Sequence, residues 1–185
     1  MGGVGTTEPP SAPPSPRSGW VVRAATPDDL EVVLAFRLAL LREHAGNPVY
    51  GRLRADAPER ARRLFAAQLE ASGEVTLLAE PGAGGSGRRG NGVVGVLRCI
   101  ESRGSPLLDP PRYGYVASVY VAPEARRHGV LRHLLDAAAA WCDARGLDEM
   151  RLHAAADNPV GNAAWEALGF GVVEHLRTRR VRPAH

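Results

Sequence analysis

Residues 124–135 read EARRHGVLRHLL, and they directly follow the run YGYVASVYVAP at 113–123. The upstream run is apolar and rich in β-branched and aromatic residues, which predicts a strand. Downstream of Gly129 the apolar residues return with the spacing of an amphipathic helix. The first N–H groups of a helix have no partner within the helix and lie at the positive end of its dipole. This junction is therefore a candidate anion site.

The residues at the junction fit an anion as bulky as a pyrophosphate. Gly129 lets the backbone approach a ligand closely, and Arg126, Arg127 and Arg132 surround it with positive charge that does not titrate. A capped helix with solvated arginines is the alternative that a single glycine beside arginines leaves open. The surrounding elements are needed to distinguish an anion site from a capped helix.

Helical and strand patterns alternate along the rest of the chain. Strands are predicted at 20–25, 75–80, 92–102, 113–121, 150–155 and 169–181, and helices at 26–41, from about Pro58 to 71, from Gly129 onward and at 160–168. The order is strand, two helices, three strands, helix, strand, helix, strand. It predicts an α/β fold, a mixed sheet with helices on both faces.

The first helix has a clear beginning and one apolar face. Thr26 suits the N-cap, Pro27 the first turn, and Asp28 and Asp29 the positive end of the dipole. A helical period then places on one face Leu30, Val33, Leu34, Arg37, Leu38 and Leu41.

The strand-to-helix unit resembles the coenzyme A site of the GNAT N-acetyltransferase superfamily. That family carries Q/R-x-x-G-x-G/A directly after a strand, and here the three positions are Arg126, Gly129 and Leu131, the last a departure from glycine or alanine. A second family signature, N-x-x-A with an aromatic residue, Glu and GF, matches NPVGNAAWEALGF at 158–170. Gly161 takes its alanine position. The two signatures occur in the family's order.

The resemblance implies a GNAT-type, mostly antiparallel mixed sheet that splays between its fourth and fifth strands, with acetyl-CoA as co-substrate in the wedge. Backbone groups of Val119, Tyr120 and Val121 would pair with the pantetheine arm, and an N–H near Val119 would face the thioester oxygen as it gains negative charge. Asn158 would contact the arm. The remaining cofactor-binding residues implied are Arg126, Arg127, His128, Gly129, Val130, Leu131 and Arg132.

Acetyl transfer to a primary amine requires a base, because such an amine has a pKa near ~10 and is mostly protonated at neutral pH. Some relatives place a glutamate about five residues before the motif asparagine, and here that position holds His153. A histidine has a suitable pKa, although a strand histidine also occurs as a structural group. Glu101, at the end of the third strand, is the second candidate base.

The proton donor to the departing thiolate is the next question. The family's tyrosine position holds Trp165, whose indole cannot act as this acid. Tyr120 and Tyr115 are the alternatives if they face the wedge. A covalent route through cysteine is possible in principle, but Cys142 and Cys99 both lie at apolar positions that predict burial.

Composition limits the partners. Basic residues number 23 against 20 acidic, all 23 of them arginine, and the net charge of +3 forms no dedicated stripe for nucleic acid. Neither a membrane span, a signal peptide nor a metal-binding cysteine pair is signalled, so a cytoplasmic, metal-free protein is predicted. A homodimer is compatible with the sequence.

The chain divides into a tail and a single domain. Residues 1–19 predict a disordered Pro/Gly-rich tail, and residues 20–185 predict one N-acetyltransferase domain.

The acceptor is left open among a small amine or amino acid, an antibiotic and a protein N-terminus. The expected activity is N-acetyl transfer by direct attack in a ternary complex. The alternative is a non-catalytic acyl-CoA-binding or regulatory domain on the same fold, which Leu131 and Trp165 would favour.

Overall fold

The computed structural model describes residues 19–82, 92–179 and 181. The predicted tail therefore lies outside the described residues except for Gly19, as does most of the turn between the second and third predicted strands. The elements are β1 Trp20–Ala24, η1 Pro27–Asp29, α1 Leu30–Glu43, α2 Ala57–Leu69, β2 Glu74–Pro81, β3 Gly95–Arg103, β4 Arg112–Val121, η2 Pro123–Ala125, α3 Val130–Asp143, β5 Met150–Leu152 and α4 Pro159–Ala167.

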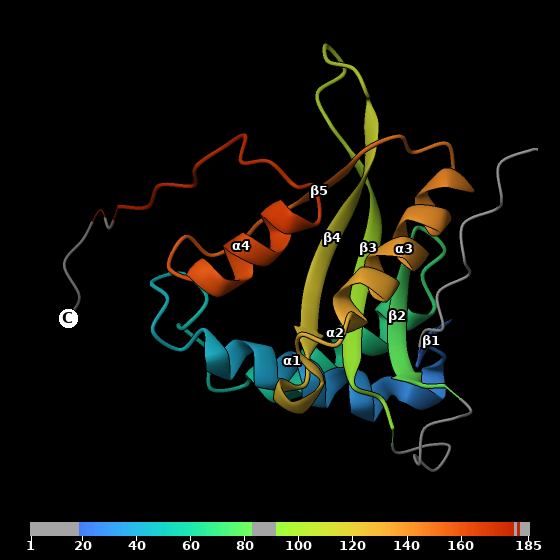
Figure 1. The fold of residues 1–185 in the computed structure, drawn as a ribbon. Helices are drawn as coiled ribbons and strands as arrows, with labels where there is room; N and C mark the ends of the chain where they lie inside the picture. The colour runs from blue at the N-terminus through green and yellow to red at the C-terminus, as the bar shows by residue number, and fades with distance from the viewer. Residues whose placement is uncertain (1–18, 83–91, 180, 182–185) are drawn as a thin grey trace, which may run out of the picture.

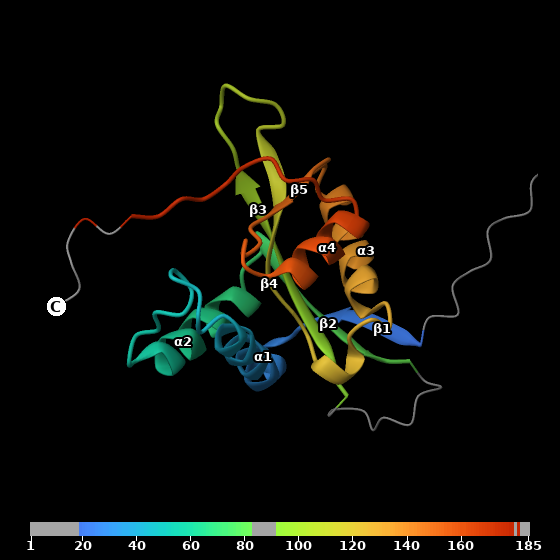
Figure 2. The same cartoon turned by 60° about the vertical axis from the view of Figure 1, so that its left-hand side comes forward.

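The strands form one five-stranded sheet in the order β1-β2-β3-β4-β5. The first four strands pair antiparallel, and β5 pairs parallel to β4. Figure 1 shows α3 crossing the sheet, and Figure 2 shows α1 and α2 on the side of the sheet opposite α3. The predicted α/β fold, with a mixed and mostly antiparallel sheet covered on both faces, is confirmed.

The sheet opens between β4 and β5. Their register holds only the pairs Gly114↔Met150, Tyr115↔Arg151 and Val116↔Leu152. Beyond them β5 ends, while β4 continues to Val121. The predicted splay between the fourth and fifth strands is thus confirmed, and it leaves the edge of β4 beyond Val116 unpaired by β5.

A β-bulge interrupts β4 within this opened stretch. Val96 on β3 lies opposite Tyr120, but Arg98 lies opposite Ala117, so β4 carries one extra residue. Ser118 has a φ of 53°, in the left-handed region that residues other than glycine seldom adopt. Because a bulge shifts the alternation of side chains, Val116 and Val119 both pack with the α3 core although they are three positions apart, and Tyr120 packs with the core under α1 and α2.

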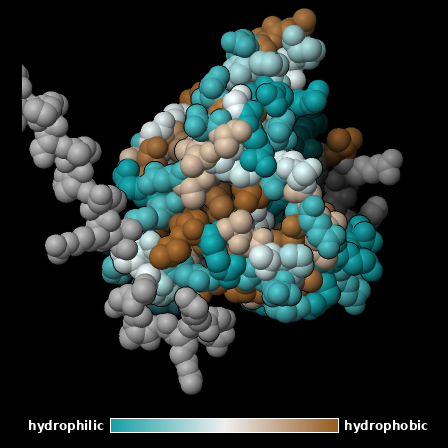
Figure 3. Space-filling model, turned by 90° about the vertical axis from the view of Figure 1, so that its right-hand side faces the viewer, coloured by the Kyte–Doolittle hydropathy of each residue, from teal (hydrophilic) through white to brown (hydrophobic). Residues whose placement is uncertain are grey.

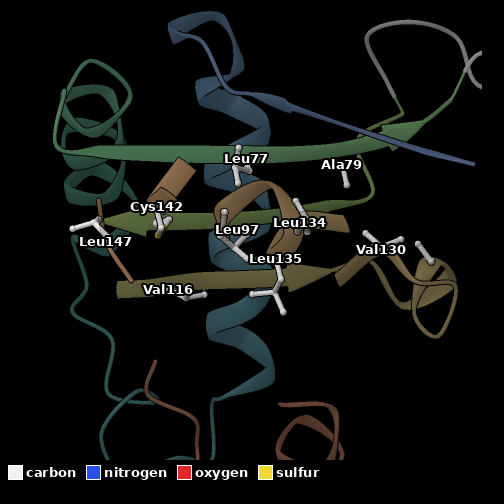
Figure 4. Packing of buried hydrophobic residues seen from close by; sticks show 12 residues of the cluster. Leu77, Ala79, Leu97, Val116, Val130, Leu134, Leu135, Cys142 and Leu147 are labelled. Atoms are coloured by element: carbon white, nitrogen blue, oxygen red, sulfur yellow. The ribbon is translucent and has the colours of Figure 1, made fainter. Parts of the chain in front are cut away.

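Two cores hold the helices on the sheet. In Figure 4, α3 places Val130, Leu134 and Leu135 over Leu97 and Val116 of the strands. Leu134 is fully buried, and burying a leucine side chain stabilises the fold by roughly 1.5–3 kcal/mol.

The second core lies on the other face of the sheet. There Val33 and Leu34 of α1 and Phe65 of α2 pack on Leu78 and Val96. The apolar face predicted for the first helix is therefore the face that it buries. Because α1 is held on the sheet by this face, the direction of the side chains in its next turn is also fixed.

The beginning of the first helix follows its sequence closely. The backbone N–H of Thr26 donates to the Asp29 carboxylate over 2.8 Å, which is one half of a capping box. The same carboxylate accepts two hydrogen bonds from the Arg23 guanidinium, at 2.7 and 2.8 Å. This bidentate pair anchors β1 to the helix start.

The predicted last strand at 169–181 is wrong for the described residues of that stretch, none of which forms a strand. Val172, Val173 and Leu176 are exposed to 68%, 95% and 75%. The local apolar pattern suits a strand, but a strand also requires a hydrogen-bonding neighbour. The neighbouring β5 is only 3 residues long and offers few backbone groups for pairing.

Figure 3 shows the face that lies opposite α4, where hydrophilic side chains surround smaller apolar areas. Within the described ranges, no helix is both long and apolar enough to cross a lipid bilayer. The opening between β4 and β5 lies on the α4 side of the molecule, as Figure 1 shows.

Candidate active site

A cleft of about 980 Å³ occupies the opening between β4 and β5. Residues 115–121 of β4 form one wall, and residues 152–155 with the inner side of α4 form the other. The start of α3 and the last turns of α1, together with Tyr50, also line it. The bulge at Ser118 lies in the β4 wall. The cleft thus includes the predicted anion site at the start of α3.

The anion end is built by Gly129 and the first turn of α3. Gly129 is the N-cap residue and has a φ of 82°. A Cβ added there would meet only the His133 ring, at 3.9 Å, so the requirement for glycine is conformational and not one of space. Arg127 also has a positive φ, of 65°. Leu131 follows in the first helical turn and lines the cleft, so the departure from the family's small residue leaves the turn helical.

The Arg126 side chain is held against β4. Its Nε donates to the Val121 carbonyl over 2.9 Å, and its Nη2 pairs with the Glu43 carboxylate. The guanidinium also lies 5.4 Å from the centre of the Tyr120 ring. Arg126 therefore ties the last turn of α1 to the junction, in addition to adding charge near the anion end.

The sequence-predicted cofactor residues are nearly all brought together. Those that line the cleft are Val119, Tyr120, Val121, Arg126, Arg127, Gly129, Val130, Leu131, Arg132 and Asn158. His128 is not among the lining residues. Its carbonyl accepts a 2.7 Å hydrogen bond from the indole Nε1 of Trp20, which fastens the junction loop to β1.

Asn158 caps α4 from the second wall. Its Oδ1 accepts a 2.9 Å hydrogen bond from the backbone N–H of Gly161. A Cβ at Gly161 would lie 2.6 Å from the Asn158 amide nitrogen, so an alanine there would displace this side chain. Glycine in the family's alanine position therefore fits the way Asn158 is folded onto the helix.

His153 and Tyr115 meet at the cleft from different strands. His153 is the first residue after β5, and its Nδ1 lies 2.9 Å from the hydroxyl of Tyr115 on β4. The imidazole is exposed, and both residues line the cleft. Burial, together with Tyr50 and Tyr113, raises the pKa of Tyr115, so its hydroxyl stays protonated. The hydrogen bond provides a path for proton transfer between the two side chains.

Of the other two predicted catalytic residues, Tyr120 lies in the cleft and Glu101 lies outside it. Tyr120 lines the cleft, and its ring lies 5.6 Å from that of Phe36. Burial and the neighbouring Glu43 carboxylate raise the pKa of Tyr120. Glu101 is not brought to the cleft, because its carboxylate binds Arg112 at 2.8 Å on another part of the sheet.

Neither cysteine reaches the cleft. Cys99 and Cys142 are buried, with their sulfurs 3.6 Å apart. Burial raises the pKa of Cys99 to about 12, so the thiol stays protonated and unreactive. In the described part of the chain, no group of three or more His, Cys, Asp or Glu side chains could hold a metal ion.

Two features of the cleft have no role predicted from the sequence. Arg37 lines it from α1 although it lies on the apolar face of that helix, and a charge within an apolar period is the signal that could have identified it. The bulge at Ser118 has no such signal, because nothing in the residue type favours a left-handed conformation there.

Comparisons with known proteins agree with this geometry. Residues 40–170 match the family described as Acetyltransferase (GNAT) family. Over 62 residues, 34% of this chain, the sequence is 36% identical to Aminoglycoside N(6')-acetyltransferase type 1 of Acinetobacter genomosp. 13. Over 63 residues, again 34%, it is 33% identical to GCN5-related N-acetyltransferase 6, chloroplastic, of Arabidopsis thaliana. The matches span only 42% and 22% of these two relatives.

The fold has close structural neighbours. A predicted acetyltransferase from Clostridium acetobutylicum, solved with acetyl-CoA, superimposes with a TM-score of 0.68 at 17% identity. The superposition covers 88% of this chain and 96% of that one. At this identity the likeness concerns the fold.

Proposed function

Because the chain belongs to the GNAT acetyltransferase family, we propose that it is an acetyl-CoA-dependent N-acetyltransferase acting on a primary amine by direct attack in a ternary complex. The observation that carries this proposal is the cleft itself. It combines the free edge of a splayed strand, a helix start capped by Gly129 and the His153–Tyr115 pair.

The residues present fit acetyl-CoA. Backbone N–H groups in the first turn of α3, with Arg127 and Arg132 beside them, would hold the pyrophosphate. The β4 edge from Val119 to Val121 would pair with the pantetheine arm, and Asn158 would face that arm from the other wall. Bound acetyl-CoA supplies an acetyl group activated as a thioester. The N–H near Val119 would donate to the acetyl oxygen.

His153 would act as the base. Its Nδ1 is engaged by Tyr115, so Nε2 is the nitrogen available to take a proton from the amine. Tyr120 keeps its proton because burial and Glu43 raise its pKa, and it would donate that proton to the departing sulfur. Trp165 contributes to packing, with its ring 5.6 Å from that of Phe170.

The acceptor is an amine, and the similarity to an aminoglycoside N(6')-acetyltransferase makes aminoglycosides a candidate class. A homodimer stays a prediction that light scattering would test. The second candidate function, a non-catalytic acyl-CoA-binding domain, is favoured by Trp165 in place of the family's tyrosine.

Turnover decides between the two candidates. The purified protein would be mixed with acetyl-CoA and a panel of amines, and release of the free thiol would be followed. Thiol release that depends on an amine supports the enzyme. Binding of acetyl-CoA without release by any amine would support the binding domain.

A further inference from the structure

Arg37 is a half-buried cation, and the described residues supply no counter-ion for it. It follows Val33 by one helical turn on the core-facing side of α1, and it lines the cleft. No ion pair or hydrogen bond connects its guanidinium to any residue of the described ranges. Two other arginines that line the cleft do have counter-ions, since Arg98 pairs with Glu74 and Arg126 pairs with Glu43.

This arrangement is unfavourable for the free protein. Burial and the nearby charge of Arg98 lower the pKa of Arg37, which means that the surroundings disfavour its charged form. An unpaired charge that is removed from water costs stability unless a partner arrives. Titratable groups with perturbed pKa values cluster at functional sites.

The charge of the cleft is strongly one-sided. Five arginines line it: Arg37, Arg98, Arg126, Arg127 and Arg132. Among the described lining residues Glu43 is the sole carboxylate, and Arg126 already occupies it. A polycationic acceptor would find no free carboxylate in this wall, while an anionic group would find Arg37.

Arg37 also lies beside the proposed point of acetyl transfer, as its cavity neighbours indicate. A small cavity of about 10 Å³ is lined by Arg37, Arg98 and the bulge residue Ser118. Ser118 directly precedes Val119, whose N–H is assigned to the acetyl oxygen. A group bound by Arg37 would thus sit next to the point where the amine attacks.

We propose that Arg37 binds a carboxylate of the acceptor, so that the acceptor is a small amine carrying a carboxylate close to its amino group, as an α-amino acid does. The guanidinium would grip the carboxylate with two parallel hydrogen bonds. The inference rests on the proposed N-acetyltransferase function and narrows its acceptor to anionic amines. It separates this chain from the aminoglycoside class that the relative's name suggests.

The test uses matched acceptors. Initial rates of thiol release from acetyl-CoA would be measured with glycine and the L-amino acids other than proline, with their α-amides, which lack the α-carboxylate, and with kanamycin as the polycation. At least one free acid should exceed its own amide by tenfold or more in kcat/KM. Kanamycin should be inactive.

Variants then assign the effect to one side chain. Arg37→Gln should raise KM for the preferred acid at least tenfold and leave the rate with its amide unchanged, because only the carboxylate contact is lost. Arg37→Lys should retain part of the discrimination. Arg63→Gln, an exposed arginine on α2 outside the cleft, is the matched control and should behave like the wild type.

The outcomes separate this inference from the proposed function. Amides or kanamycin turned over as well as the acids would overturn the inference and leave the acetyltransferase intact. Equal losses with acid and amide in Arg37→Gln, or no turnover of any free acid by a protein that binds acetyl-CoA, would also overturn it. Failure to bind acetyl-CoA would instead contradict the proposed function.

Discussion

The hydroxyl of Tyr115 and Nδ1 of His153 lie 2.9 Å apart, which joins β4 to the end of β5 at the point where the two strands part. If Nδ1 donates to the hydroxyl oxygen, Nε2 carries a lone pair and can act as a base. The hydrogen bond orients the ring whichever group donates. It makes Tyr115 a positioning residue for His153.

His153→Ala should lower kcat by roughly 10²-fold or more, the usual contribution of a positioned general base. Binding of acetyl-CoA should be unchanged, because the imidazole lies on the wall away from the α3 start. Steady-state kinetics and calorimetric titration check the two halves. Normal turnover between about pH 6 and pH 9 would show that the base has been misassigned.

Tyr115→Phe should have a smaller effect than His153→Ala, because it removes only the hydrogen bond that orients the ring. The loss should appear in kcat and not in KM, because the hydroxyl contacts the base and not the acceptor. A kcat equal to that of the wild type would exclude the positioning role.

Arg37→Met should raise the melting temperature by about 2–4 °C, the shift that corresponds to about 1 kcal/mol in a chain of this size. Methionine keeps the packing of the aliphatic stem and removes a half-buried, unpaired charge. Calorimetry of the ligand-free protein measures the gain. A fall in melting temperature would mean that the guanidinium stabilises the free fold after all.

The Arg23–Asp29 pair predicts a pH dependence of stability. Hydrogen bonds from Arg23 hold the pKa of Asp29 at about 2, below its usual value of 3.8. A carboxylate with a lowered folded-state pKa stabilises the fold above its unfolded pKa and loses this contribution as pH falls toward the folded one. Asp29→Asn should therefore cost about 1 kcal/mol at pH 7.

That cost should shrink between about pH 4 and pH 2, where the wild-type carboxylate takes up its proton. Urea unfolding of both proteins over a pH series measures the difference. A constant gap across the series would rule out the linkage.

The two buried thiols should be inert in the native protein. The pKa of Cys99 is raised from 9.0 to about 12, which lowers its thiolate population about a thousandfold near neutral pH. Ellman's reagent should react with both cysteines only after urea is added. Rapid labelling of native protein would contradict this burial.

Glycine substitutions give a matched pair for the same packing. A Cβ at Gly114 would meet the Cys142 sulfur at 2.4 Å, whereas one at Gly73 would meet nothing within 4 Å. Gly114→Ala should cost about 1–3 kcal/mol by overpacking and speed the labelling. Gly73→Ala should do neither.

Much of the fold could be predicted because it follows local rules. Helical periodicity predicts the buried face of α1, and Thr26 and Asp29 predict where that helix begins. The glycine at position 129 predicts a helix entry whose backbone a ligand can approach closely. These features depend on residues within a few positions of one another.

Other features depend on pairing between distant segments. The contact of Tyr115 with His153 joins residues 38 positions apart and requires the parallel register of two strands. The bulge at Ser118 depends on how β3 and β4 align. The segment after α4 has the pattern of a strand, but the short β5 does not pair with it. Local sequence contains none of this information.

Calorimetric titration with acetyl-CoA tests the central claim most directly, using the wild type, Gly129→Ala and Gly129→Glu. Both variants place a side chain at a φ of 82°, so they share the backbone strain, and only the glutamate adds negative charge at the anion end. The wild type should bind, Gly129→Ala should bind more weakly, and Gly129→Glu should show no binding. No binding by the wild type, or equal binding by the two variants, would contradict a pyrophosphate site at the start of α3.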